Sequence, residues 1–214
     1  SPDFITKKFR GEFFTADAIS QILELSRSFD ATLIGNGLGR NAETLRFAAA
    51  LCKKASGLKV IDADAISAVR MQDVQNAVFT PHMGEYGVLL RNSSMGVGAP
   101  LSTVQRAVGS NVLLVKGYPA VHKQHTDAII SKNKITYNKT GNAGMTVGGT
   151  GDVLAGLAAG LLAQEKDLFK AATVSAYVNG KAGDLLLKKC GWGFTASDLV
   201  EKLPAVLKPL WKFK

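Results

Sequence analysis

Cysteine is scarce in this chain of 214 residues, which contains only Cys52 and Cys190. Neither belongs to a CxxC motif or to a Cys/His spacing, and both lie in stretches with helical periodicity. The sequence therefore argues against a disulfide framework and against a structural zinc site. Isolated thiols of this kind are typical of a reducing compartment, so we predict a cytoplasmic location.

Long apolar runs are missing as well. The longest, from Val153 to Ala163, is about half of the ~20 residues that a membrane-spanning helix needs. The opening residues, SPDFITKKFR, lack the charged, apolar and small-residue order of a signal peptide. We therefore predict that the protein has no membrane partner.

Acidic residues are fewer than basic ones, with 17 Asp and Glu against 26 Lys and Arg and a net charge of +9. This balance favours anionic partners, such as nucleotides or nucleic acids. The densest basic clusters are Lys53-Lys54, Lys188-Lys189 and Lys208, Lys212 and Lys214. None is interleaved with aromatic residues, as a nucleic-acid surface would be, so we interpret them as solvated helix faces and expect no nucleic-acid partner.

Predicted strands alternate with predicted helices along the chain. Four apolar runs indicate strands at residues 31–35, 58–62, 76–80 and 111–117, and residues 127–131 and 134–138 indicate an antiparallel pair. Helices are expected at 16–29, 41–56, 84–91, 101–109, 150–164, 168–188 and 195–207. No repeat or linker interrupts the pattern. We predict one domain over residues 1–214, an α/β fold with a mostly parallel sheet covered by helices on both faces.

Ligands of such sheets bind beyond the carboxyl ends of the strands, where this sequence places unusual residues. The sequence GNGLG (35–39) follows the first strand and indicates either a close backbone approach to a ligand or a tight turn. Asp62 and Asp64 follow the second strand. We interpret Asp64 as a helix N-cap and Asp62 as a residue that orients a metal-bound phosphate or a ribose hydroxyl.

Two further strand ends carry polar side chains. The third strand is followed by TPHMGE (80–85), in which Thr80 or His82 is suited to cap the next helix, and His82 beside Glu85 is also a candidate ligand contact. Lys116 ends the apolar run NVLLV. A lysine there is costly unless it meets an anion, and the alternative is a side chain that reaches solvent at the rim.

The most specific stretch is NAGMTVGGTGDVLAGLAAGLLAQ (142–164). Gly148, Gly149, Thr150 and Gly151 lead into a helix, so free amides and the positive helix end point at one spot and predict an anion site. No GxxxxGK[ST] is present, so this is not a Walker A loop. Asp152 beside a phosphate suits a base that deprotonates an attacking hydroxyl. A favourable helix-dipole contact would explain the acid but not the four small residues before it.

Taken together and in this order, these motifs resemble the ribokinase-like superfamily, and more narrowly the NAD(P)H-hydrate dehydratase family. Members of that family repair hydrated NADH and NADPH with ADP or ATP. The resemblance covers roughly residues 31–187, and AYVNGKAGDLL (176–186) continues it, with Asn179 where family members often have histidine. Family members usually begin with a further strand, a glycine-rich turn and an alanine-rich helix, so we expect this chain to be short at its N-terminus.

The resemblance implies roles for individual residues. Asp152 would be the catalytic base, and the hydrated nicotinamide would contact Gly37 and His82. The nucleotide would lie along Lys116, Gly117, Tyr118, Pro119 and Ala120, with its terminal phosphate on the amides of Gly149, Thr150 and Gly151. Mg²⁺ would bridge the phosphates near Asp62 and Glu85. The family also implies a homo-oligomer, commonly a tetramer.

Two alternatives share this phosphate site. A ribokinase-like kinase acting on a thiazole or pyrimidine alcohol would keep the anion site and Asp152 but differ in the substrate pocket. A remnant that binds nucleotide without catalysis would keep only the binding contacts. The sequence does not choose between ADP and ATP.

Overall fold

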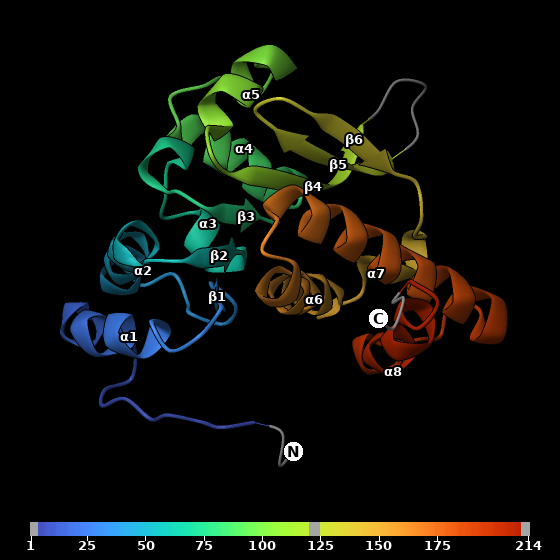
Figure 1. Cartoon of the computed structure of the whole chain (residues 1–214), viewed down its shortest axis with the longest axis horizontal. Coiled ribbons are helices and arrows are strands. Elements are labelled where there is room, and N and C mark those ends of the chain that lie inside the picture. Colours follow the sequence, from blue (N-terminus) through green and yellow to red (C-terminus); the bar gives the residue numbers. More distant parts are fainter. Residues whose placement is uncertain (1–3, 120–124, 211–214) are drawn as a thin grey trace.

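A computed structural model describes residues 4–119 and 125–210 of the chain. Its six strands form one sheet in sequential order: β1 (Ala31–Ile34), β2 (Leu58–Ile61), β3 (Ala77–Phe79), β4 (Val112–Pro119), β5 (His125–Ser131) and β6 (Ile135–Asn138). The first four strands are parallel, whereas β5 and β6 are antiparallel to their neighbours (Figure 1). The predicted mostly parallel sheet is thereby confirmed.

The central strands are buried on both faces of the sheet, which explains why their sequences are continuously apolar. Val60 and Val78 contribute to one core cluster, and their neighbours Ile61 and Phe79 contribute to the other. Because successive side chains of a strand point to opposite faces, an alternating polar residue would have placed a polar group in one of the two cores.

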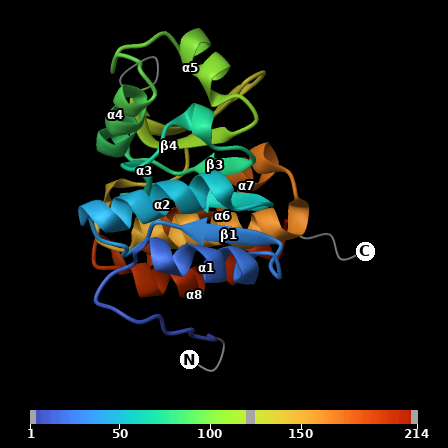
Figure 2. The same cartoon turned by 90° about the vertical axis from the view of Figure 1, so that its left-hand side faces the viewer.

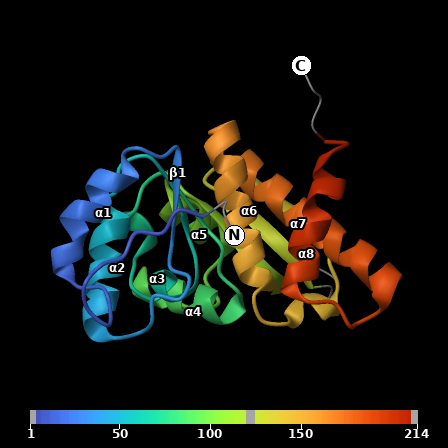
Figure 3. The same ribbon diagram turned by 90° about the horizontal axis from the view of Figure 1, so that it is seen from below.

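Helices cover both faces of the sheet, as predicted. One layer contains α1 (Ile19–Ser26), α2 (Ala42–Lys54), α3 (Ala63–Ile66), α4 (Met83–Asn92) and α5 (Leu101–Val108). The other contains α6 (Thr150–Glu165) and α7 (Leu168–Cys190), with α8 (Ala196–Leu207) packed against both. Figure 2 shows α2 beside the sheet, and Figure 3 shows α1 to α4 on one side of β1 and α6 to α8 on the other. Among the described helices, none is long and apolar enough to cross a membrane.

Short polar residues start most of the long helices. The side chain of Asn41 accepts a hydrogen bond from the Glu43 amide at the start of α2, and Asp167 accepts one from the Lys170 amide at the start of α7. Such caps satisfy amides that have no partner within the helix. Helix α6 is different, because its N-cap is Gly149 at φ 88° and no side-chain cap is formed there.

Several predicted boundaries are wrong by a few residues, for example at both ends of α2 and at the start of β5. The helix expected over 16–29 is a 3₁₀ turn, η1 (Ala16–Ala18), followed by α1, which ends at Ser26. The strand expected to end at Gly117 continues to Pro119, because Tyr118 and Pro119 still pair with β5. The register of this pairing is irregular between Val115 and Tyr118. In this irregular stretch the Gly117 amide donates to Asp127 Oδ1 over 3.2 Å.

Candidate phosphate-binding and catalytic site

The carboxyl ends of the four parallel strands bring the sequence motifs together. The carboxylate of Asp62, after β2, accepts hydrogen bonds from Thr80 Oγ1 after β3 at 2.8 Å and from Asn36 Nδ2 after β1 at 3.0 Å. It also pairs with Lys116 Nζ of β4 at 3.3 Å. One buried carboxylate therefore ties together side chains from all four strand ends.

The charge of Lys116 is balanced inside the protein. Its side chain is 20% exposed, and that of its partner Asp62 is 4% exposed. Of the two interpretations of Lys116, the structure supports the one in which the lysine meets an anion, although the anion that it meets here is a protein carboxylate. Removing either partner would leave a charge poorly compensated in a site of low solvent access.

The start of α6 faces this ion pair. A Cβ atom built on Gly151 would lie 3.3 Å from Lys116 Nζ, so the ammonium group lies against the first turn of the helix. The hydroxyl of Thr150 donates to Met145 O at 2.6 Å and thereby holds the preceding loop in place. The positive end of a helix dipole, first-turn amides without a side-chain cap and a lysine converge here, as an anion-binding site requires.

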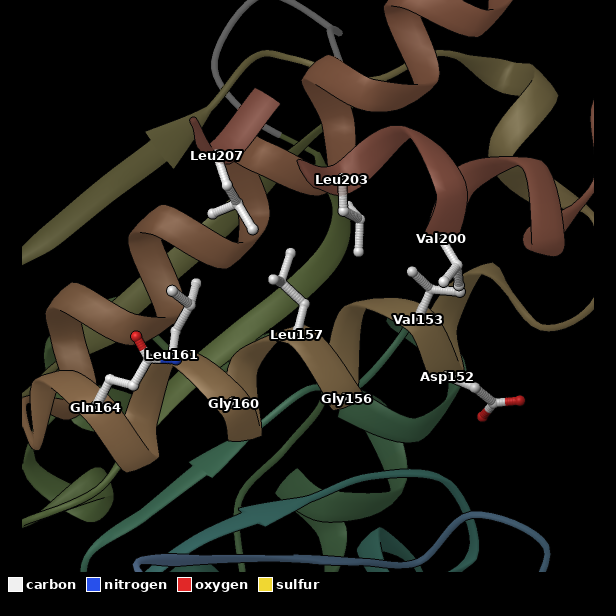
Figure 4. A pocket seen from close by; sticks show the side chains of 10 residues that line it. All are labelled: Asp152, Val153, Gly156, Leu157, Gly160, Leu161, Gln164, Val200, Leu203 and Leu207. Carbon is white, nitrogen blue, oxygen red and sulfur yellow. The ribbon is translucent and has the colours of Figure 1, made fainter. Parts of the chain in front are cut away.

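Asp152 lies in the first turn of α6 and is exposed. Its Oδ1 atom accepts a hydrogen bond from Asn36 Nδ2, the same amide nitrogen that donates to Asp62. Asp152 lies at one end of a groove of about 540 Å³ between α6 and α8. Figure 4 shows its carboxylate turned away from the apolar side chains of the groove. The groove is lined by Gly156, Leu157 and Gly160 of α6 and by Leu203 of α8, among others.

His82 and Glu85 form a capping box at the start of α4. His82 Nδ1 accepts from the amides of Gly84 at 3.0 Å and Glu85 at 3.3 Å, and Glu85 Oε2 accepts from the His82 amide at 3.0 Å. Of the two residues predicted as possible caps of this helix, Thr80 and His82, the structure shows that His82 is the cap. Its side chain is nevertheless 59% exposed, so the rest of the ring remains accessible to a ligand.

The cap gives His82 a measurable structural role. Replacing His82 by Ala should lower the free energy of unfolding by about 1 kcal/mol, because two amides lose their acceptor. His82→Asn should recover most of this loss, since asparagine is among the best N-cap residues. Urea unfolding of the three proteins provides the test, and equal stability of His82→Ala and wild type would contradict the assigned cap.

The prediction that Asp64 caps a helix is wrong. Asp64 lies within α3, and its carboxylate accepts from the Gly39 amide and from Arg40 Nε, both at 2.9 Å. Asp62 occupies the N-cap position instead, but its side chain makes no capping hydrogen bond because it is turned toward Lys116. The GNGLG loop is thus fastened to α3 by Asp64 and to the strand ends by Asp62.

The residues expected near Mg²⁺ do not fit a metal held by the protein. Asp62 is occupied by Thr80, Asn36 and Lys116, and Glu85 caps α4. Within residues 4–119 and 125–210, no group of three or more His, Cys, Asp or Glu side chains could hold a metal ion. Mg²⁺ usually keeps several waters and binds through one or two carboxylates together with substrate phosphates, rather than in an all-protein cage.

Most of the other residues assigned by resemblance belong to the loop after β1 and to the end of β4. Gly37 is exposed in the loop after β1, separated from His82 by the strand end that carries Asp62. Gly117, Tyr118 and Pro119 belong to β4, and the Tyr118 ring packs edge-on against Tyr86 with ring centroids 6.2 Å apart. Ala120 lies outside the described residues.

Burial raises the pKa of Asp127 above its ordinary value, while hydrogen bonds from Asn138 and Gly117 and the charge of Lys116 oppose this shift. Asp127 lies on β5 and supports the irregular stretch of β4 that contains Gly117. Nothing in the period-2 pattern of residues 127–131 distinguished it from an ordinary strand residue.

Asn36 and Asp127 are the two side chains of this site that the sequence motifs did not single out. The sequence signal that could have identified Asn36 is its position, since it is the polar residue between two glycines directly after a strand. Ligands commonly bind at such strand ends. Its two carboxylate partners are 26 and 116 residues away along the chain. Only the fold brings them within hydrogen-bonding distance.

The fold and this site together define a ribokinase-like α/β protein. A ribokinase-like superfamily protein of Enterococcus faecalis V583 superimposes with a TM-score of 0.74 at 26% identity, covering 90% of this chain and 68% of that one. The Bacillus subtilis ADP/ATP-dependent NAD(P)H-hydrate dehydratase co-crystallised with ATP/Mg²⁺ shares the fold, with a TM-score of 0.68 at 22% identity over 88% of this chain and 70% of that one.

A family model described as NAD(P)H-hydrate dehydratase matches residues 1–205, and the chain belongs to this family. The bifunctional NAD(P)H-hydrate repair enzyme Nnr of Methanocaldococcus jannaschii is 38% identical over 210 residues, 97% of this chain and 39% of that protein. The ADP-dependent (S)-NAD(P)H-hydrate dehydratase of Cenarchaeum symbiosum is 38% identical over 152 residues, 70% of this chain and 51% of that protein. The chain thus spans about two fifths of the length of the first curated relatives that it matches.

Proposed function

We propose that this chain dehydrates hydrated NADH and NADPH with ADP or ATP as the phosphoryl donor. The hydroxyl group on the hydrated nicotinamide ring attacks the terminal phosphorus of the nucleotide, and the bond to the nucleotide's bridging oxygen breaks. Phosphate then leaves the ring carbon, a neighbouring proton is lost, and the double bond of the reduced nicotinamide is restored.

The observation that carries this proposal is the arrangement at the start of α6. Asp152 is a carboxylate in the first turn of a helix whose amides have no side-chain cap, and the ammonium group of Lys116 lies against the neighbouring Gly151. A carboxylate opposes phosphate binding electrostatically, so its presence is best explained by a chemical role. We assign Asp152 as the base that takes the proton of the attacking hydroxyl, while the amides of Gly149, Thr150 and Gly151 stabilise the charge on the transferred phosphoryl group.

The two substrates approach from opposite sides of Asp152. The nucleotide lies along Lys116 to Ala120 with its terminal phosphate at the start of α6, and any Mg²⁺ arrives bound to its phosphates. The hydrated nicotinamide lies on the side of Gly37 and His82. His82→Ala and His82→Asn should both weaken binding of the hydrated cofactor if the imidazole contacts it, although only His82→Ala loses the helix cap.

The proposal is tested by incubating the protein with hydrated NADH and either ADP or ATP. We expect the near-ultraviolet absorbance of reduced nicotinamide to return only when nucleotide is present, with one nucleotide cleaved for each NADH restored. A reaction without nucleotide measures spontaneous reversion. Comparing ADP with ATP identifies the phosphoryl donor.

The alternatives give different outcomes in the same experiment. Phosphorylation of a thiazole or pyrimidine alcohol without recovery of NADH would identify a kinase. Nucleotide binding in calorimetry without turnover of either substrate would identify a binding remnant. Both outcomes would reject the dehydratase.

A further inference from the structure

One side-chain amide links the two carboxylates of the site. Asn36 Nδ2 donates to Asp62 Oδ2 at 3.0 Å and also to Asp152 Oδ1. We infer that Asn36 is a positioning residue, which orients the Asp152 carboxylate toward the reacting hydroxyl. It also fixes the position of this carboxylate relative to the Asp62–Lys116 ion pair. The inference rests on the proposed function, in which Asp152 is the base.

The orientation of the Asn36 amide follows from its surroundings. With the nitrogen toward Asp62 and Asp152, both contacts are hydrogen bonds to ionised acceptors, which are stronger than neutral ones. The opposite orientation would point the amide oxygen at two carboxylates and make both contacts repulsive. The two carboxylates therefore determine that the amide nitrogen, and not the oxygen, faces them. The Asn36 side chain cannot rotate toward another partner without losing both hydrogen bonds.

The oxygen atom of the same amide is left without a partner. Asn36 Oδ1 is buried and makes no hydrogen bond among the described residues. A buried acceptor without a partner costs free energy, because water satisfied it in the unfolded chain. A residue selected for stability alone would not retain this arrangement. The arrangement is explained if the benefit of Asn36 is the position that it gives to Asp152.

The surrounding charges make this position matter. Asp152 projects from the first turn of α6, and the ion pair of Asp62 and Lys116 joins the end of β2 to β4. The charge of Lys116 also acts on the carboxyl group of Asp127 in β5. Arg40, four residues further along the Asn36 loop, pairs with Asp64 of α3. Without the bridging amide, Asp152 would lose its link to Lys116 through Asp62 and would be free to turn toward solvent.

The experiment compares turnover of wild type, Asn36→Ala, Asn36→Asp and Asp30→Asn in the dehydration assay. Asn36→Ala removes the donor, and Asn36→Asp keeps the size but places a third carboxylate between the other two. We expect kcat to fall about 10- to 100-fold for Asn36→Ala, the loss typical of a misplaced catalytic group, and further for Asn36→Asp. Asp30→Asn changes an exposed acid that pairs with Lys166 and does not touch Asn36 or Asp152, and its kcat should match wild type.

A double-mutant cycle with Asp152→Asn separates positioning from a general structural effect. If Asn36 acts through Asp152, adding Asn36→Ala to Asp152→Asn should lower kcat no further, and the thermal unfolding midpoint of Asn36→Ala should stay near that of wild type. Wild-type kcat in Asn36→Ala, or full additivity in the cycle, would overturn the inference while leaving the proposed function intact. An inactive wild type would instead reject the proposed function, and the inference with it.

Discussion

Replacing Asp152 by Asn is expected to reduce kcat by about 10²- to 10⁴-fold, the usual contribution of a general base. The substitution preserves shape, and the new amide oxygen can still accept the hydrogen bond from Asn36. What disappears is the ability to take a proton as the phosphoryl group is transferred. The phosphate site should survive, because its attraction comes from the helix amides and Lys116 rather than from the acid.

Nucleotide affinity distinguishes this chemical role from the alternatives. Asp152→Asn removes a negative charge beside the phosphates, so calorimetry should give equal or tighter binding of ADP or ATP. Asp30→Asn is a suitable control, because Asp30 is a 65% exposed acid paired with Lys166. This substitution should change neither kcat nor the affinity for nucleotide. Near-normal turnover of Asp152→Asn would reject the base, and loss of nucleotide binding would make Asp152 a binding or structural residue.

The second large effect is expected at Gly35, where Ala should destabilise the fold by about 2–6 kcal/mol, the sum of backbone strain and overpacking. A Cβ atom built on Gly35 would lie only 1.7 Å from the carbonyl oxygen of Asp62, and the residue has φ 135°. The backbone hydrogen bond from Asp62 N to Ile34 O, 3.0 Å long, holds the two strand ends together and leaves no room for a methyl group.

Gly37 provides the matched control two residues further along the same loop. It also has positive φ, at 68°, but a Cβ atom built there meets nothing within 4 Å. Gly37→Ala should therefore cost only the left-handed backbone penalty of about 1–2 kcal/mol. Urea unfolding should show a much lower midpoint for Gly35→Ala than for Gly37→Ala. Equal losses would mean that close packing against Asp62 does not explain Gly35.

The partners of the site residues illustrate the limit of reading motifs one at a time. The sequence indicated that Lys116 needs an anion, but Asp62 is 54 residues away, and no local pattern joins the two. It suggested Asp64 as a cap, whereas Arg40 and the Gly39 amide occupy that carboxylate. The positions of Gly37 and His82 on the substrate side, and of Lys116 to Ala120 along the nucleotide, stay predictions until ligand binding is measured.

The sequence by itself determined the succession of strands and helices, and it predicted the anion site at the start of α6. Both depend on residues within a few positions of one another: apolar periodicity, helix caps, and the glycines before Asp152. The tertiary structure alone decided how far β4 extends, because its last residues are held by pairing with β5. It also decided that Asn36 bridges Asp62 and Asp152, since hydrogen bonds between distant residues depend on how the strand ends converge in space.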